Sequence, residues 1–197
     1  GERGNQMSLF PPQGMYLKGI NRQVLWSYAT PIYRARLPVP NAKTEGISEI
    51  TEVPEAVPMF ELLAPKIPLE LLEITCGAFR WVLETGQRQL EAAMYLCYQD
   101  ENWFCKMPCQ EISACNVSPE PISALDHVGM VIHSHGFMPA FFSSTDNNGE
   151  DDGFIFGVVG DLKNVMPQFK FRVGDRGYFL PVQFEDLWDY ERKVVPC

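Results

Sequence analysis

Short hydrophobic runs bounded by polar residues punctuate the first forty positions, a pattern typical of β-strands. The runs 14–17 and 24–28 are separated by the polar residues 18–23, so we predict a hairpin, with a third strand at 32–37. Residues 38–68 lose this pattern and contain six prolines among acidic residues. Because proline removes a backbone donor, we predict an irregular covering segment or linker there.

The period changes from strand to helix over residues 69–90. Pro68 stands where a helix starts, and Gly86 lies near its expected end. The hydrophobic residues recur every three or four positions, which places them on one face of a helix. The predicted buried face consists of Leu72, Cys76, Phe79 and Leu83.

Most of the remaining hydrophobic runs predict strands. The run 92–98 is too apolar for a solvated face and predicts a central strand, with 103–107 as its hairpin partner. Further strands are expected at 128–132, 154–159, 169–173 and 178–182, and an acidic surface loop at 147–153. Many strands with few helices predict an α+β fold, or an α/β-type sandwich of sheet and helices.

Composition restricts the class of protein. A chain of 197 residues that is 46% hydrophobic and 12% aromatic can bury a core and is unlike a disordered one. We divide it into a β-rich extension with its proline-rich segment, residues 1–68, and a core, residues 69–197. The net charge of −9 disfavours a nucleic-acid partner. Neither a membrane span nor a secretory signal pattern is present, so we expect a cytoplasmic protein without a membrane partner.

The six cysteines are expected to be free thiols. Cys76 and Cys97 fall in apolar patterns and are typical of reduced core residues. The spacing of Cys105, Cys109 and Cys115 allows a structural metal site as an alternative. No C-x-x-C pair or histidine stands nearby to complete it.

Two of the three histidines follow the apolar run 128–132 at a spacing suited to one metal ion. The pattern is H-x-H-x7-S-x2-D, in which His133, His135 and Asp146 supply three ligand atoms. Positions i and i+2 of a strand point the same way, so both imidazoles can reach one ion. Two nitrogens and one oxygen leave a tetrahedral position open for water, as in a catalytic zinc site.

Two simpler interpretations remain open for these residues. A His-x-His pair on a strand is often ordinary core or surface histidine. Ser143 and Asp146 also have the spacing of a helix capping box, in which the serine side chain accepts from a backbone N–H of the first turn. A capping role and a ligand role do not exclude each other.

A metal-activated water needs a proton acceptor that is not itself a ligand. Glu91 is our first candidate because it precedes the apolar run 92–98, where a core strand would hold it at a fixed position. An ordinary polar residue at a strand end is the alternative interpretation. The other candidate bases are Glu84 on the predicted helix, Glu101 in a hairpin turn, and Glu111 and Glu120 in an irregular segment rich in cysteine and proline.

The order of these residues resembles the JAMM/MPN+ metalloprotease signature. Glu91 is followed by Ala-Ala-Met-Tyr-Leu-Cys, then 42 positions later (133 minus 91) by His-Ser-His, and then by Ser143 and Asp146. The resemblance implies a JAB/MPN-like fold, a central mixed β-sheet flanked by helices. It also implies a catalytic Zn²⁺ ion held by His133, His135 and Asp146. Glu91 would then be the general base, and Ser143 would steady the water or the oxyanion.

The resemblance covers residues 70–190 and implies hydrolysis of a peptide or isopeptide bond at the tail of a ubiquitin-like protein. Gly136 stands where eukaryotic members usually have proline, and we expect it to loosen the loop. The stretches 132–146 and 171–178 look more like a bacterial branch, the PRTRC system protein A type. That branch implies a ubiquitin-like substrate and an E1-like protein as partners.

Two rival functions stay open. Many MPN domains keep the fold without the metal and act as scaffolds, which the full set of five site residues disfavours. A hydrolase of small amides or of carrier-protein conjugates could use the same site. Zinc content distinguishes the first rival, and kinetics on a carrier-protein fusion against a short peptide distinguish the second.

Overall fold

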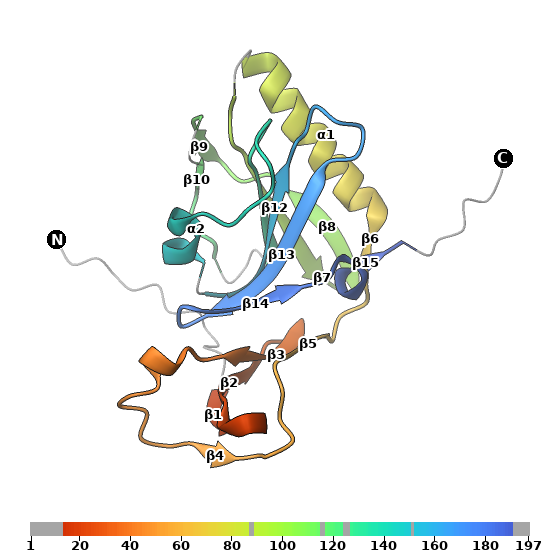
Figure 1. Cartoon of the computed structure of the whole chain (residues 1–197). Helices are drawn as coiled ribbons and strands as arrows, with labels where there is room; N and C mark the ends of the chain where they lie inside the picture. The colour runs from red at the N-terminus through yellow and green to blue at the C-terminus, as the bar shows by residue number, and fades with distance from the viewer. Residues whose placement is uncertain (1–13, 87–88, 115–116, 124–126, 151, 191–197) are drawn as a thin grey trace.

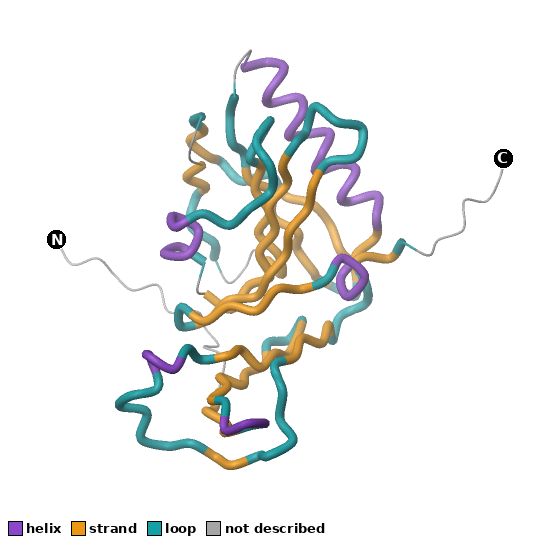
Figure 2. The backbone as a smooth tube through the Cα atoms, viewed as in Figure 1, coloured by secondary structure: helices purple, strands orange, loops and turns teal. Residues whose placement is uncertain are grey.

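A computed structural model describes residues 14–86, 89–114, 117–123, 127–150 and 152–190 (Figure 1). This part of the chain contains many strands and few helices, in agreement with the α+β prediction (Figure 2). Two larger sheets form the framework. Among the described residues, none of the helices has the length and apolar character needed to cross a membrane.

The N-terminal sheet has five strands in the order β4-β1-β2-β3-β5. Their bounds are β1 (Gly14–Lys18), β2 (Val24–Ala29), β3 (Tyr33–Pro38), β4 (Thr51–Glu52) and β5 (Met59–Leu62). The predicted hairpin and third strand are confirmed, because β1, β2 and β3 pair antiparallel in sequence order. Two single-turn 3-10 helices, Ile20–Arg22 and Asn41–Lys43, lie in the connections.

The proline-rich segment is more regular than we expected. It contains β5, which pairs antiparallel with β3, and Ile67 within it is fully buried. Pro58 immediately precedes β5 and Pro65 follows it, so neither proline removes a donor from the strand's own ladder. Pairing with β5 satisfies the edge of β3, which a linker would leave exposed.

The second sheet has six strands in the order β14-β13-β12-β11-β7-β8. Their bounds are β7 (Ala93–Gln99), β8 (Asn102–Lys106), β11 (Val128–Ser134), β12 (Asp152–Gly160), β13 (Gln168–Asp175) and β14 (Tyr178–Val182). The strands β11 and β12 pair parallel and the other neighbours pair antiparallel, so the sheet is mixed. Every strand predicted for this part of the chain is present.

A short hairpin of β9 (Gln110–Ile112) and β10 (Val117–Pro119) was not predicted. It lies in the segment that we expected to be irregular. Strands of three residues are too short to display a hydrophobic alternation, so the sequence carries no signal for them. The hairpin projects beside the six-stranded sheet, on the same side as α2 (Ser144–Gly149) (Figure 1).

Helix α1 (Leu69–Gly86) covers the other face of the six-stranded sheet (Figure 1). Its predicted face of four residues is buried, together with Thr75 and Val82. The short elements β6 (Ile67–Pro68), α3 (Phe184–Leu187) and β15 (Trp188–Asp189) close the end of this layer, where β6 and β15 pair. The helix and the strands beneath it share one hydrophobic cluster that continues into the N-terminal sheet.

Residues from both sheets meet in that cluster. Trp26 of β2 donates from its indole Nε1 to the carboxylate of Asp175 at the end of β13, at 2.6 Å and away from solvent. Arg176 lies over the Trp26 ring, 3.9 Å from its centroid. The N-terminal sheet therefore packs against the β13–β14 end of the second sheet.

Strand alternation separates the two faces of the six-stranded sheet. Met94 and Leu96 of β7 belong to the cluster under α1, whereas Tyr95 belongs to a smaller cluster on the opposite face. On β11, Ile132 belongs to the α1 cluster, and His133 therefore points to the opposite face. The face away from α1 carries the candidate site.

Candidate metal centre

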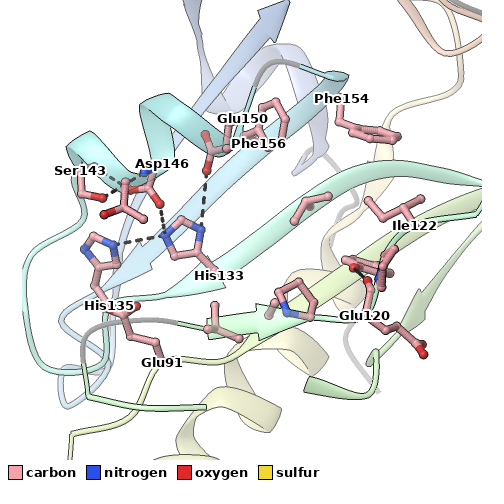
Figure 3. A pocket seen from close by; sticks show the side chains of 18 of the residues that line it. Glu91, Glu120, Ile122, His133, His135, Ser143, Asp146, Glu150, Phe154 and Phe156 are labelled. Atoms are coloured by element: carbon pink, nitrogen blue, oxygen red, sulfur yellow. Dashed lines mark hydrogen bonds and ion pairs between the residues drawn. The ribbon is translucent and has the colours of Figure 1, made fainter. Parts of the chain in front are cut away.

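The two histidines of the H-x-H pattern lie side by side at the end of β11 (Figure 3). His133 is the second-last residue of the strand, and His135 continues its direction by donating its backbone N–H to the Val159 carbonyl of β12. The Nε2 atoms of the two rings are 3.2 Å apart. Both side chains are buried, with exposed fractions of 7% and 3%.

Helix α2 brings the third residue to the same point. Ser143 is its N-cap, and a full capping box is present: the Ser143 hydroxyl accepts from the Asp146 N–H at 3.2 Å, and Asp146 Oδ2 accepts from the Ser143 N–H at 2.6 Å. The other oxygen, Asp146 Oδ1, is 3.4 Å from His133 Nε2. Asp146 thus caps the helix with one oxygen and faces the histidines with the other.

Two of the three separations among these atoms match a single tetrahedral ion, and all three atoms lie within 4.8 Å of one another. A zinc ion with ligands at about 2.0–2.1 Å separates neighbouring ligand atoms by about 3.3 Å. The two separations above are 3.2 and 3.4 Å. In the described part of the chain, His133, His135 and Asp146 are the only group of three or more potential ligand side chains gathered in this way.

Both imidazoles are held in the form that binds metal. Burial lowers the pKa of His133 to about 4, and the nearby Asp146 carboxylate only partly opposes this effect. Burial also lowers the pKa of His135. The rings are therefore neutral at neutral pH, and a neutral imidazole offers a lone pair to a metal.

Glu91 reaches the site through the pairing of two strands. Strand β7 runs antiparallel to β11 with Ala93 opposite His133, and continuing that register by two residues places Glu91 opposite His135. Glu91 is only 6% exposed and lines the same cavity as the histidines. Burial, together with the smaller effect of the nearby Asp146 charge, raises the pKa of the Glu91 carboxyl to about 7.

The other glutamates that the sequence offered as bases are placed less well. Glu84 lies on the exposed side of α1, on the opposite face of the sheet, and Glu101 lies in the exposed β7–β8 turn. Glu111 and Glu120 are exposed as well, and only Glu120 reaches the cavity. Glu91 is the buried carboxylate among these candidates.

The loop after the histidines is held firmly, contrary to our expectation for Gly136. The side-chain amide of Gln89 donates to the His135 carbonyl at 2.6 Å and accepts from the Phe137 N–H at 2.9 Å. The Gly136 carbonyl also accepts from the Leu162 N–H at 2.9 Å. Gly136 has a φ of +58°, which proline cannot adopt. Glycine therefore permits a tight loop here and does not loosen it.

We expect Gly136→Ala to destabilise the protein. A Cβ at this position would lie 2.5 Å from the Gln89 amide, and the left-handed conformation costs an alanine about 1–2 kcal/mol. For a chain of this size the melting temperature should fall by roughly 2–8 °C. Gly77→Ala on α1 is the matched control, since its Cβ would meet no atom within 4 Å and alanine favours a helix. Equal melting temperatures for Gly136→Ala and the wild type would contradict this account.

A cavity of about 510 Å³ extends from the candidate ligands along the sheet. Aliphatic and aromatic side chains form its floor: Tyr95, Val131, Phe154 and Phe156 from the strands and Ile122 from the segment after β10. Among the described residues that line it, the charged ones are acidic or histidine, and none is lysine or arginine. The cavity therefore suits an uncharged or cationic segment.

The walls of this cavity come from residues 91–95, 117–122 and 131–156 among the described residues, so the proline-rich segment 38–68 forms no part of it. The predicted surface loop at 147–153 is more regular than we expected, and Gly149 and Glu150 line the cavity. Asn147 to Gly149 complete α2, and Glu150 is only 8% exposed because it pairs with Arg172 across the sheet.

Sequence reasoning missed three residues near the centre: Gln89, Glu150 and Arg172. None stands at a spacing that indicates chemistry, and each contacts the site through a partner at least seventeen positions away. The cysteine predictions concern other parts of the fold. Of the six, Cys76, Cys97, Cys105 and Cys109 are not in disulfides, and Cys115 and Cys197 lie outside the described residues.

The proposed cysteine metal site gains no support from the described residues. Cys105 lies under α1, where its sulfur is 3.6 Å from the Leu71 carbonyl and 3.8 Å from the Thr75 hydroxyl. Cys109 is exposed.

A comparison of the chain with protein-family models finds no match, and a search of the curated proteins finds no relative.

Proposed function

We propose that this protein is a zinc-dependent peptidase or isopeptidase of the JAMM type, with a JAB/MPN-like core. One observation carries the proposal: three ligand atoms lie within 4.8 Å of one another, in the cavity that also holds the buried Glu91. The resemblance of the motif supplies the substrate class, the C-terminal tail of a ubiquitin-like protein. An E1-like protein of the same system and a cytoplasmic location belong to the same proposal.

Zinc bound by His133, His135 and Asp146 would polarise the scissile carbonyl and acidify a water molecule. In this proposal Glu91 would accept the proton of that water and pass it to the leaving amine. Its raised pKa of about 7 suits both tasks, because a group that titrates near the working pH can accept and then release a proton.

Ser143 is placed to stabilise the developing oxyanion. Its hydroxyl oxygen accepts from the Asp146 N–H, so its own hydrogen can be donated toward the site.

Phe141 packs edge-on against His135, with ring centroids 4.5 Å apart, and is itself partly exposed. The substrate segment would lie along the apolar floor of the cavity, since that floor ends at the candidate ligands.

We expect the zinc-loaded protein to cleave a ubiquitin-like fusion or isopeptide conjugate after the carrier's C-terminal residue. Intact mass spectrometry of the products identifies the bond that is cut. Matched substrates should be a linear fusion, a lysine-linked conjugate and a short peptide of the same tail. Cleavage of the short peptide alone would support the small-amide hydrolase. A protein that contains zinc and cleaves none of the three substrates would contradict the proposal. A protein that binds no zinc would support the alternative of a metal-free scaffold.

A further inference from the structure

Arg172 of β13 is buried beside the candidate centre without facing the cavity. Its guanidinium lies between two aromatic rings, 3.8 Å from the centroid of Phe142 and 4.1 Å from that of Phe179. Phe179 belongs to the neighbouring strand β14, whereas Phe142 immediately precedes the N-cap of α2. Stacking on both faces fixes the plane of the guanidinium, because each ring attracts the cation.

The edge of the same guanidinium binds the C-terminal half of α2 and its C-cap, Glu150. Nη1 donates to Asn147 Oδ1 at 2.7 Å, and Nε and Nη2 both donate to Glu150 Oε2 at 3.0 and 2.8 Å. Helix α2 has six residues, fewer than an isolated helix needs to be stable in water. Its place on the sheet, and with it the place of Asp146, therefore depends on contacts such as these.

Glu150 connects this arginine to a candidate ligand. Its oxygen Oε2 accepts from Arg172, and its other oxygen Oε1 lies 3.9 Å from Nδ1 of His133 (Figure 3). The opposite nitrogen of that ring, Nε2, faces His135 and Asp146. A carboxylate beside Nδ1 favours a proton on that nitrogen, and this leaves the lone pair of Nε2 for a metal.

We propose that Arg172 and Glu150 are positioning residues for the metal centre. Arg172 fixes α2 and Glu150, and Glu150 sets the orientation and tautomer of His133. The inference rests on the proposed zinc site, and it concerns how tightly that site binds before any substrate is present. Neither residue belongs to the group of three candidate ligands.

The test is the zinc affinity of Glu150→Gln, measured at pH 8 by competition with a chromophoric chelator. Glutamine keeps the size of the side chain but presents an NH₂ group either to His133 Nδ1 or to Arg172, so two donors oppose each other. We expect the affinity to fall about 10–100-fold, the range typical of changes to the groups that orient metal-binding residues. Arg172→Lys should also weaken zinc binding, because an ammonium group cannot donate in two directions and stack at once.

Two further measurements separate positioning from a general loss of structure. The melting temperature of metal-free Glu150→Gln should stay within a few degrees of wild type, and ¹⁵N NMR should show a larger share of the Nε2-protonated tautomer of His133. Glu61→Gln is the control, since Glu61 also pairs with an arginine, Arg34, at an exposed position of the N-terminal sheet. Its zinc affinity should equal that of the wild type.

The outcomes distinguish this inference from the proposed function. If the wild type binds zinc and Glu150→Gln binds it within threefold with an unchanged tautomer, the positioning role is wrong and the zinc site stands. If the wild type binds no zinc, both are wrong. If both proteins bind as expected but neither cleaves a substrate, the positioning role holds and the hydrolase proposal fails.

Discussion

Glu91→Gln should lower turnover by about 10²–10⁴-fold without loss of zinc. Glutamine preserves the shape of the side chain opposite His135 but cannot accept a proton. Glu91 is outside the group of three ligand side chains, so zinc content should stay near that of the wild type. Steady-state kinetics on the ubiquitin-like conjugate, with elemental analysis of the same samples, measure both quantities.

Glu84→Gln on the exposed side of α1 controls for the loss of one carboxylate and should keep full activity. Loss of zinc from Glu91→Gln would identify Glu91 as a ligand and change the mechanism. Full activity of Glu91→Gln would show that another group acts as the general base. In that case the resemblance to the JAMM motif would be wrong at its upstream end.

The stability of Glu91→Gln shows whether unfolding causes its loss of turnover. Burial raises the pKa of Glu91 from its ordinary value of 4.5 to about 7, so the folded state disfavours the ionised form. This carboxyl therefore supports the fold below about pH 4.5, and that contribution is lost as the pH rises toward 7. Metal-free Glu91→Gln should thus melt no lower than the wild type at pH 8. A lower melting temperature would show that glutamine disturbs the packing.

His135→Ala should reduce the zinc content from about one ion per chain to nearly none, with activity falling to background. Only two candidate ligands remain, and Zn²⁺ sites in proteins ordinarily need at least three protein ligands. The fold should survive, because the ligands lie at the end of β11 and on α2 and outside the hydrophobic clusters. Elemental analysis and a melting curve test the two statements separately.

His127→Asn is the control for this experiment. His127 is exposed and its φ is +51°, a conformation that asparagine tolerates. That variant should retain its zinc, whereas His135→Ala should not. Undiminished zinc in His135→Ala would exclude this centre as the binding site. Unfolding of the wild type on treatment with a chelator would show that the ion is structural.

The sequence alone determined the elements whose signal is local. The hydrophobic runs located the six strands of the second sheet, and the period of Leu72, Cys76, Phe79 and Leu83 located α1 and its buried face. His133, His135 and Asp146 could be grouped because they lie within fourteen positions and strand alternation aligns the two histidines. Such patterns are readable because each depends only on neighbouring residues.

The tertiary structure decided everything that depends on which segments pair. Glu91 faces His135 because β7 and β11 align antiparallel, and Gln89 reaches the histidine loop from the same segment. Glu150 is buried because Arg172 of β13 binds it from across the sheet. Strand β5 is regular because it pairs with the otherwise unpaired edge of β3. Periodicity predicts on which face of a strand or helix a side chain lies. It does not predict which residue that side chain contacts, because the contact depends on the packing of the whole chain.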